Sequence, residues 1–356
     1  MPSAPMTLPS PGPKSFFGLS RAALARELEG RGESGYRAGQ LYSWVYHRHE
    51  RDPGRMTNLP GELRRALGAW LDLGLPRPAA VRATTDGATH KFSLALADGA
   101  LVECVSMRTD RGYTLCLSSQ VGCALKCSFC ATGLMGLKRN LGAAEIVGQV
   151  FAMGEFLGWP DERFNLVFMG MGEPLANYAP VVEAVRILHD PHGLNFGARR
   201  ITVSTSGLVP QIRQLAEERI PVGLAVSLHA TTDTLRDELV PVNRRWPLAE
   251  LLEAARDYGR VSGRRVTLEY TLIADENDRA EDADRLAAMA RDLPSKINLI
   301  PYNPVPGLPY RRPAPEAVEA FALSLYPRAP SVTVRQTMGG EIWAACGQLG
   351  GLDAGA

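Results

Sequence analysis

The residues Gly122-Cys123-Ala124-Leu125-Lys126-Cys127-Ser128-Phe129-Cys130 carry the strongest signal in this chain. They place three cysteines at CxxxCxxC spacing, with an aromatic residue directly before the third. Three thiolates can hold three irons of a [4Fe–4S] cluster and leave the fourth iron open to a small molecule. An open iron favours chemistry on a bound ligand, whereas four thiolate ligands favour a simple electron carrier. Cys123, Cys127 and Cys130 are therefore predicted to bind a [4Fe–4S] cluster.

A structural zinc site is the alternative for the same three cysteines. Such a site needs four closed ligands, usually arranged as two separated pairs. The remaining cysteines, Cys104, Cys116 and Cys346, form no second CxxC pair, and no histidine lies between Asp110 and Asn140. A disulfide framework is disfavoured as well, because a chain of this size without an apolar secretory segment is expected in the cytoplasm, where thiols stay reduced.

The cysteine spacing is similar to the signature of radical S-adenosylmethionine (SAM) enzymes, and the neighbouring motifs sharpen the resemblance. Five of them follow in order: Gly170-Met171-Gly172-Glu173-Pro174, Ser204-Thr205-Ser206-Gly207, Ser227-Leu228-His229-Ala230, Lys296-Ile297-Asn298-Leu299-Ile300-Pro301-Tyr302-Asn303-Pro304 and Ala344-Ala345-Cys346-Gly347-Gln348-Leu349. Together with the cysteines they resemble the RlmN family, which methylates C2 of an adenosine in large-subunit ribosomal RNA and in certain tRNAs. The resemblance covers about residues 35 to 350.

Composition bounds these expectations. The 356 residues are 45% hydrophobic, which is enough for a substantial core, and the formal net charge is only +1. RNA binding must therefore come from local basic patches. The candidates are the doublets Lys138-Arg139, Arg199-Arg200, Arg244-Arg245, Arg264-Arg265 and Arg311-Arg312. No run of about eighteen apolar residues and no signal peptide is present, so we expect no membrane contact.

The order of the segments predicts the domains. Residues 1–15, rich in proline and serine, are expected to be a disordered tail. Residues 16–95 are expected to form a helical accessory domain, which the resemblance implies binds RNA, and a linker. Residues 96–345 alternate strands and helices, which favours an α/β fold with a parallel sheet. About six units are expected, so the resemblance implies a partial (β/α)6 radical SAM barrel, followed by residues 346–356 as a segment carrying a methyl-carrier cysteine.

The motifs lie at the predicted carboxyl ends of strands or in the loops after them, which is where such a barrel builds its site. An acidic side chain beside glycine, as in Gly172-Glu173, can accept a hydrogen bond from the ammonium group of SAM. The resemblance implies that SAM is bound by Gly172, Glu173, Ser204, Ser227, Leu228, His229 and Asn303. Taken alone, His229 would more often be a packed core histidine.

Two cysteines outside the triplet matter for the reaction. Adenine C2 has no lone pair with which to attack a methyl sulfonium, so direct displacement on SAM is implausible. The resemblance implies that Cys346 first accepts a methyl group from one SAM and that a second SAM, cleaved by an electron from the cluster, activates that methyl carbon to bond RNA. It further implies that Cys116 releases the RNA through a transient Cys116–Cys346 disulfide and that Glu103 accepts a proton. Cys104 is expected to be structural.

Three alternatives stay open. A Cfr-type enzyme would methylate C8 of the same adenine with the same cysteines, although the segments 40–45 and 56–60 fit the C2 family. A glycyl-radical activating enzyme would need neither Cys116 nor Cys346, and a non-catalytic iron–sulfur electron carrier would normally have four ligands. The expected partners are ribosomal RNA, tRNA and an electron donor such as flavodoxin or ferredoxin. The protein is expected to be a cytoplasmic monomer.

Overall fold

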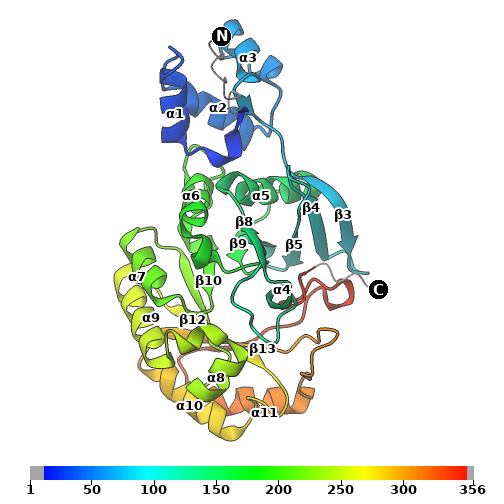
Figure 1. Cartoon of the computed structure of the whole chain (residues 1–356), viewed down its shortest axis with the longest axis vertical. Helices are drawn as coiled ribbons and strands as arrows, with labels where there is room; N and C mark the ends of the chain where they lie inside the picture. The colour runs from blue at the N-terminus through cyan, green and yellow to red at the C-terminus, as the bar shows by residue number, and fades with distance from the viewer. Residues whose placement is uncertain (1–11, 351–356) are drawn as a thin grey trace, which may run out of the picture.

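The computed structural model describes residues 12–350 and begins with a group of short helices at one end of the molecule (Figure 1). Its elements are β1 (Lys14–Ser15), α1 (Arg21–Glu29), α2 (Arg37–Tyr42), α3 (Gly61–Leu67) and β2 (Leu71–Asp72). Ser20 caps α1, because its hydroxyl accepts from the Ala23 amide. Most of the predicted tail, residues 1–11, lies outside the described residues, but Lys14 and Ser15 pair in parallel with β2 and are not a tail.

A ten-stranded sheet in the order β14-β13-β12-β11-β10-β9-β6-β5-β4-β3 forms the body of the protein. Its strands are β3 (Arg77–Ala83), β4 (Thr89–Ala95), β5 (Leu101–Thr109), β6 (Gly112–Cys116), β9 (Phe164–Phe168), β10 (Ile201–Thr205), β11 (Gly223–Ser227), β12 (Val266–Leu272), β13 (Ser295–Pro301) and β14 (Val332–Val334). Strands β6 and β9 to β14 are parallel, and β3 to β6 are antiparallel. The parallel part, with a helix after most strands, confirms the predicted α/β radical SAM fold.

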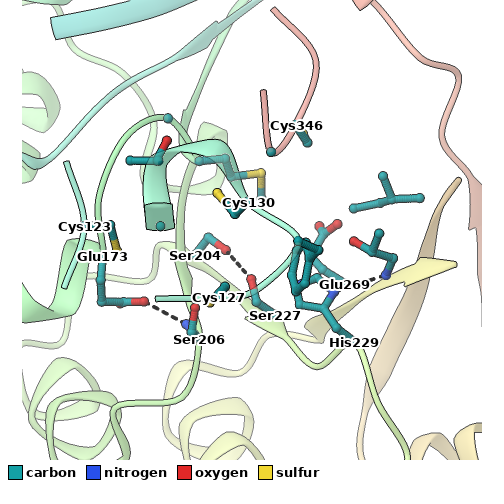
Figure 2. Close-up of a pocket in the computed structure, with 18 of the residues that line it drawn as sticks. Cys123, Cys127, Cys130, Glu173, Ser204, Ser206, Ser227, His229, Glu269 and Cys346 are labelled. Carbon is teal, nitrogen blue, oxygen red and sulfur yellow. Dashed lines mark hydrogen bonds between the residues drawn. The ribbon is translucent and has the colours of Figure 1, made fainter. Parts of the chain in front are cut away.

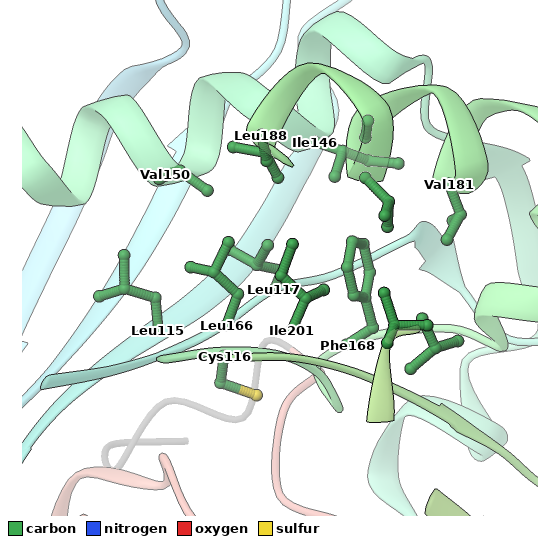
Figure 3. Packing of buried hydrophobic residues seen from close by; sticks show 14 of the residues in the cluster. Leu115, Cys116, Leu117, Ile146, Val150, Leu166, Phe168, Val181, Leu188 and Ile201 are labelled. Atoms are coloured by element: carbon green, nitrogen blue, oxygen red, sulfur yellow. The ribbon is translucent and has the colours of Figure 1, made fainter. Parts of the chain in front are cut away.

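Helices follow the parallel strands and cover the outer face of the sheet (Figure 1). They are α5 (Ala143–Leu157), α6 (Tyr178–His189), α7 (Val209–Glu217), α8 (Asp233–Leu239), α9 (Leu248–Ser262), α10 (Ala280–Arg291) and α11 (Pro315–Leu325). Ile146 and Val150 of α5 and Val181 of α6 face Leu115 and Leu166 of the strands (Figure 3). Because side chains alternate along a strand, the neighbouring Cys116 points to the opposite face, toward the interior of the barrel.

The segment 77–95, which the sequence places with the accessory domain and linker, forms strands of the main sheet. Strands β3 and β4 are hydrogen-bonded to each other and to β5, and they extend the main sheet. Strand β3 is mostly exposed, so its sequence lacks the apolar alternation of a half-buried strand. The domain boundaries drawn from the sequence stay predictions. None of the helices described between residues 12 and 350 combines the length and hydropathy needed to span a bilayer.

Candidate active site

The three predicted cluster ligands lie on one tight loop between β7 (Gln120–Gly122) and α4 (Ala131–Leu134). Strand β7 pairs with β8 (Leu137–Asn140), which closes the loop at its base. Gly122 has φ +78°, and a Cβ there would lie 1.8 Å from the Gly136 carbonyl oxygen. A Cβ at Gly133 would lie 2.8 Å from the Cys127 carbonyl oxygen. Glycine is therefore required at both positions for the loop to fold back on itself.

Cys123, Cys127 and Cys130 all line one pocket. Burial raises the pKa of the Cys123 thiol to about 12, and it also raises the pKa of Cys127 and of Cys130. Three half-buried thiols with raised pKa values would stay protonated unless a cationic group replaced their protons. Thiolates are also the ligands that iron–sulfur clusters use. The donor set therefore fits an iron–sulfur cluster.

Glu173 follows β9 and lies beside Cys123 of the cysteine loop (Figure 2). Its carboxylate accepts from the backbone amides of Leu175 at 3.0 Å and Ser206 at 2.8 Å. Burial raises the pKa of Glu173 to about 6 despite these hydrogen bonds. The preceding Gly172 has φ +97°, and a Cβ there would lie 2.5 Å from Gln120. The backbone thus presents an acidic side chain that can receive a cationic amine.

The ends of β10 and β11 supply hydroxyl groups to the same pocket. The Oγ atoms of Ser204 and Ser227 lie 3.4 Å apart (Figure 2). Leu228, by contrast, is fully buried and does not line the pocket. Its backbone amide donates to the Glu269 carbonyl oxygen at 2.9 Å, so only its main chain can contribute to the site.

His229 lines the pocket as a neutral imidazole. It is 6% exposed, and burial lowers its pKa to about 3. Its Nδ1 accepts from the Thr271 amide at 3.1 Å, and its ring packs edge-on against Phe129 of the cysteine loop, with centroids 5.0 Å apart. A neutral ring with Nδ1 acting as acceptor carries its proton on Nε2, which leaves Nε2–H as a donor.

Asn303 and Cys346 bring the C-terminal segment to the pocket. Asn303 Nδ2 donates to the Cys346 carbonyl oxygen at 3.1 Å, and Asn303 Oδ1 accepts from Arg312 and Thr337. The Ala131 amide at the start of α4 donates to the Gly347 carbonyl oxygen at 2.8 Å. The segment that carries Cys346 therefore contacts the end of the cysteine loop. It also contacts Asn303, which lies 43 positions earlier in the chain.

Cys346 also lines a second, larger cavity of about 670 Å³, and Cys116 lines that cavity as well. The two cavities share Met169, Ile300, Asn303 and Arg335 in addition to Cys346. All six cysteines are free thiols, so the disulfide between Cys116 and Cys346 is not supported. Burial raises the pKa of the Cys116 thiol to about 12. Cys104 is fully buried and lines neither cavity, as a structural cysteine would be.

Glu103 on β5 lines neither cavity. Its carboxylate lies 3.3 Å from the ammonium of Lys91, and both side chains are almost completely buried. The other carboxylate oxygen accepts from the Gly350 amide at 2.9 Å. The structure thus connects Glu103 to the segment that carries Cys346, and not to the pocket with the cluster cysteines.

Two charged residues of the site were missed at the sequence level. Glu269 is buried in the middle of β12, and both of its carboxylate oxygens accept from Asn298 at 3.1 and 3.0 Å. Arg335 lies directly after β14, with Nη1 3.9 Å from the Met169 sulfur. The nearby Cys346 thiol is the main cause that raises the pKa of Arg335. For Glu269, the available signal in the sequence was a glutamate inside the strand Val266–Leu272, which is buried along its whole length.

The predicted basic doublets differ in how free they are to contact RNA. Arg139 donates to the carboxylates of Asp98 and Glu145, so its charge is already paired. Arg264 donates to backbone carbonyl oxygens, so its guanidinium stabilises the fold. Arg245 lies over the ring of Trp246, 4.7 Å from its centroid. A guanidinium stacked on an aromatic ring keeps its N–H groups available at the edge.

The chain is similar to known proteins in sequence and in structure. Residues 15–71 match the family described as ribosomal RNA large subunit methyltransferase N-terminal domain, and residues 117–287 match the radical SAM superfamily. A probable dual-specificity RNA methyltransferase RlmN from Symbiobacterium thermophilum is 49% identical over 339 residues, which cover 95% of this chain and 91% of the relative. A dual-specificity RNA methyltransferase RlmN from an Anaeromyxobacter species is 49% identical over 355 residues, which cover 98% and 93%.

One crystal structure matches the whole fold. The radical SAM methyltransferase from Sphaerobacter thermophilus superposes with a TM-score of 0.90 and 47% sequence identity. The match covers 94% of this chain and 99% of that chain. This chain therefore shares the arrangement of sheet, cysteine loop and N-terminal helices with that methyltransferase.

Proposed function

Since the chain belongs to the RlmN family of radical SAM RNA methyltransferases, we propose that it methylates C2 of an adenosine in 23S ribosomal RNA, and in tRNA, through a methylated Cys346. The observation that supports this most is the position of Cys346 on the wall shared by two cavities. One cavity carries the three cluster cysteines and Glu173, and the other carries Cys116. Cys346 can thus receive a group on one side and deliver it on the other.

The cofactor residues follow from the pocket. Cys123, Cys127 and Cys130 would hold a [4Fe–4S] cluster, which when bound supplies the electron for reductive cleavage of SAM. Glu173 would accept from the SAM ammonium. Hydroxyl groups from two strand ends would donate to the carboxylate or the ribose of SAM. Amide, imidazole and main-chain groups would complete the SAM site. These further residues are Gly172, Ser204, Ser227, Leu228, His229 and Asn303.

The remaining side chains would carry the methyl group and the proton. A Cys346 thiolate would attack the methyl carbon of SAM, forming a thioether. The 5′-deoxyadenosyl radical from a second SAM would take a hydrogen atom from that methyl group, and the resulting carbon radical would add to adenine C2, so that protein and RNA become covalently joined. Cys116, on the wall of the same cavity, would release the RNA by attack on the Cys346 sulfur, for which the two segments must approach. Glu103, connected to the same segment through Gly350, would accept the proton from the ring.

Methylation of C8 is the nearest rival, because the shared residues serve both carbons. The names of the relatives and the match of residues 15–71 favour C2. A glycyl-radical activating enzyme or an iron–sulfur electron carrier would leave Cys346 and Cys116 without a use. The proposed partners are ribosomal RNA, tRNA and a low-potential donor such as flavodoxin or ferredoxin, with the enzyme acting as a cytoplasmic monomer.

Opposite phenotypes of two cysteine variants test the proposal. Cys116→Ala should accumulate a protein–RNA species that survives denaturation and disappears with nuclease, since attachment is intact and release is lost. Cys346→Ala should form no such species, and the double variant should behave like Cys346→Ala. Cys104→Ala serves as the matched control, because that cysteine lines neither cavity. Normal turnover by Cys116→Ala, or methylation by Cys346→Ala, would contradict the proposed cycle.

A further inference from the structure

Arg236 of α8 is a completely buried cation that the proposed reaction does not use. Its guanidinium makes four hydrogen bonds, all to neutral oxygen atoms. Nε donates to the Leu228 carbonyl at 3.0 Å, and Nη1 donates to Asn243 Oδ1 at 2.9 Å. Nη2 donates to the carbonyls of Ser206 at 2.6 Å and Ser227 at 3.1 Å. Among the residues from 12 to 350, no carboxylate lies within ion-pair distance of it.

A buried charge without a counter-charge is costly, so its presence calls for a reason. Burial lowers the pKa of Arg236 to about 10, which still leaves the guanidinium protonated at neutral pH. Asp233 and Asp237 lie on the same helix, but both accept from Asn243 Nδ2, at 2.9 and 2.7 Å. The asparagine therefore lies between these carboxylates and the guanidinium, and their charges act on Arg236 without direct contact.

The cation lies against the cysteine loop through two contacts. Ser206 lines the pocket together with Cys127, and Arg236 donates to the carbonyl of the same serine. One turn further along α8, the Leu239 carbonyl accepts from the Ser128 amide at 3.1 Å. The positive charge is thus connected to a predicted cluster ligand by one residue, inside protein that water does not screen.

The other ionisable groups of the pocket leave this charge in place. His229 is neutral, because burial and the Arg236 charge both lower its pKa. Glu173 carries the negative charge on the pocket wall beside the loop, and in the proposed function it is matched by the SAM ammonium. Glu269 and Arg335 also line the pocket, and their opposite charges act on each other. With SAM bound, Arg236 would remain as the buried cation next to Cys127.

We propose that Arg236 raises the reduction potential of the cluster and so allows it to accept an electron. The proposal rests on the proposed function, because it requires a [4Fe–4S] cluster on Cys123, Cys127 and Cys130. Reduction adds one electron from the donor to the cluster, with no bond made and no proton moved. A fixed neighbouring cation stabilises that added negative charge, and net charge and hydrogen bonds to sulfur are known determinants of cluster potentials.

The test is a redox titration of reconstituted protein, in which the reduced cluster is followed by electron paramagnetic resonance. Arg236→Met should lower the ratio of reduced to oxidised cluster at a fixed potential at least tenfold, which corresponds to about 59 mV for one electron. Arg236→Lys, which keeps the charge, should stay close to wild type. Equal potentials in all three proteins, or equal losses in both variants, would overturn the proposal.

Two milder variants decide the question if neither Arg236 variant loads iron. Asp237→Asn removes a negative charge from the Arg236–Asn243 network and should shift the potential upward. Glu238→Gln makes the same change of charge at the adjacent, exposed position and should have no effect. Identical potentials for these two proteins would overturn the proposal. Wild-type protein that binds no iron would instead contradict the proposed function.

Discussion

Glu173 offers a quantitative test of the pocket, because burial raises its pKa to about 6. If the SAM ammonium binds the ionised carboxylate, SAM affinity must fall as the pH falls through that value. Linkage with a pKa of about 6 gives an affinity about fourfold lower at pH 5.5 than at pH 7.5. Replacing a hydrogen bond to a charged group costs about 1.5–3 kcal/mol, so Glu173→Gln should bind SAM about 10- to 100-fold more weakly.

The assay is equilibrium binding of SAM to iron-loaded protein between pH 5.5 and 7.5, for wild type and Glu173→Gln. The variant should bind weakly and with no change across this range, since glutamine does not titrate. Folding stability gives a second readout, because it should change with pH in the direction opposite to SAM affinity. The raised pKa of Glu173 means that folding stability falls as the pH rises from 4.5 to about 6, by about 2 kcal/mol, and this loss should be absent in the variant. A pH-independent affinity of the wild type, or the same profile in both proteins, would refute the reasoning.

Two further outcomes are expected. Cys127→Ala should lose the cluster and all SAM cleavage, as measured by iron content and by 5′-deoxyadenosine formation. Cys104→Ala should keep both the cluster and SAM cleavage. A full cluster in Cys127→Ala would contradict the ligand assignment. Arg65→Gln, at an exposed position on α3, should weaken RNA binding and reduce the slope of log affinity against log salt by about one. Arg260→Gln on the exposed side of α9 is its control, and equal effects of the two would leave the N-terminal helices without a part in RNA binding.

The candidate pocket could be predicted to a large extent because parallel strands end at one edge of a sheet. Glu173 follows β9, Ser204 lies in β10 and Ser227 ends β11, and the structure brings all three to one pocket with the cysteine loop. Motif order along the chain was sufficient here, since successive parallel strands are neighbours in the sheet.

The rest depended on tertiary contacts that sequence periodicity does not encode. Glu103 meets Lys91 on the neighbouring strand and Gly350, which is 247 positions away, so neither partner could be inferred from local pattern. Arg335 is one of many arginines in the sequence, and only its place beside Cys346 and Met169 distinguishes it. The sequence around Arg236 is typical of a helix surface, yet the Arg236 side chain is completely buried.

The central claim is that this chain methylates adenine at C2. The most direct test is mass spectrometry of adenosine from 23S ribosomal RNA and tRNA after incubation with reconstituted enzyme, SAM and a reductant. Authentic 2-methyladenosine and 8-methyladenosine serve as chromatographic standards. The account predicts 2-methyladenosine in the wild-type reaction and none with Cys346→Ala. A product that elutes as 8-methyladenosine, or no methylated adenosine from iron-loaded enzyme that cleaves SAM, would contradict it.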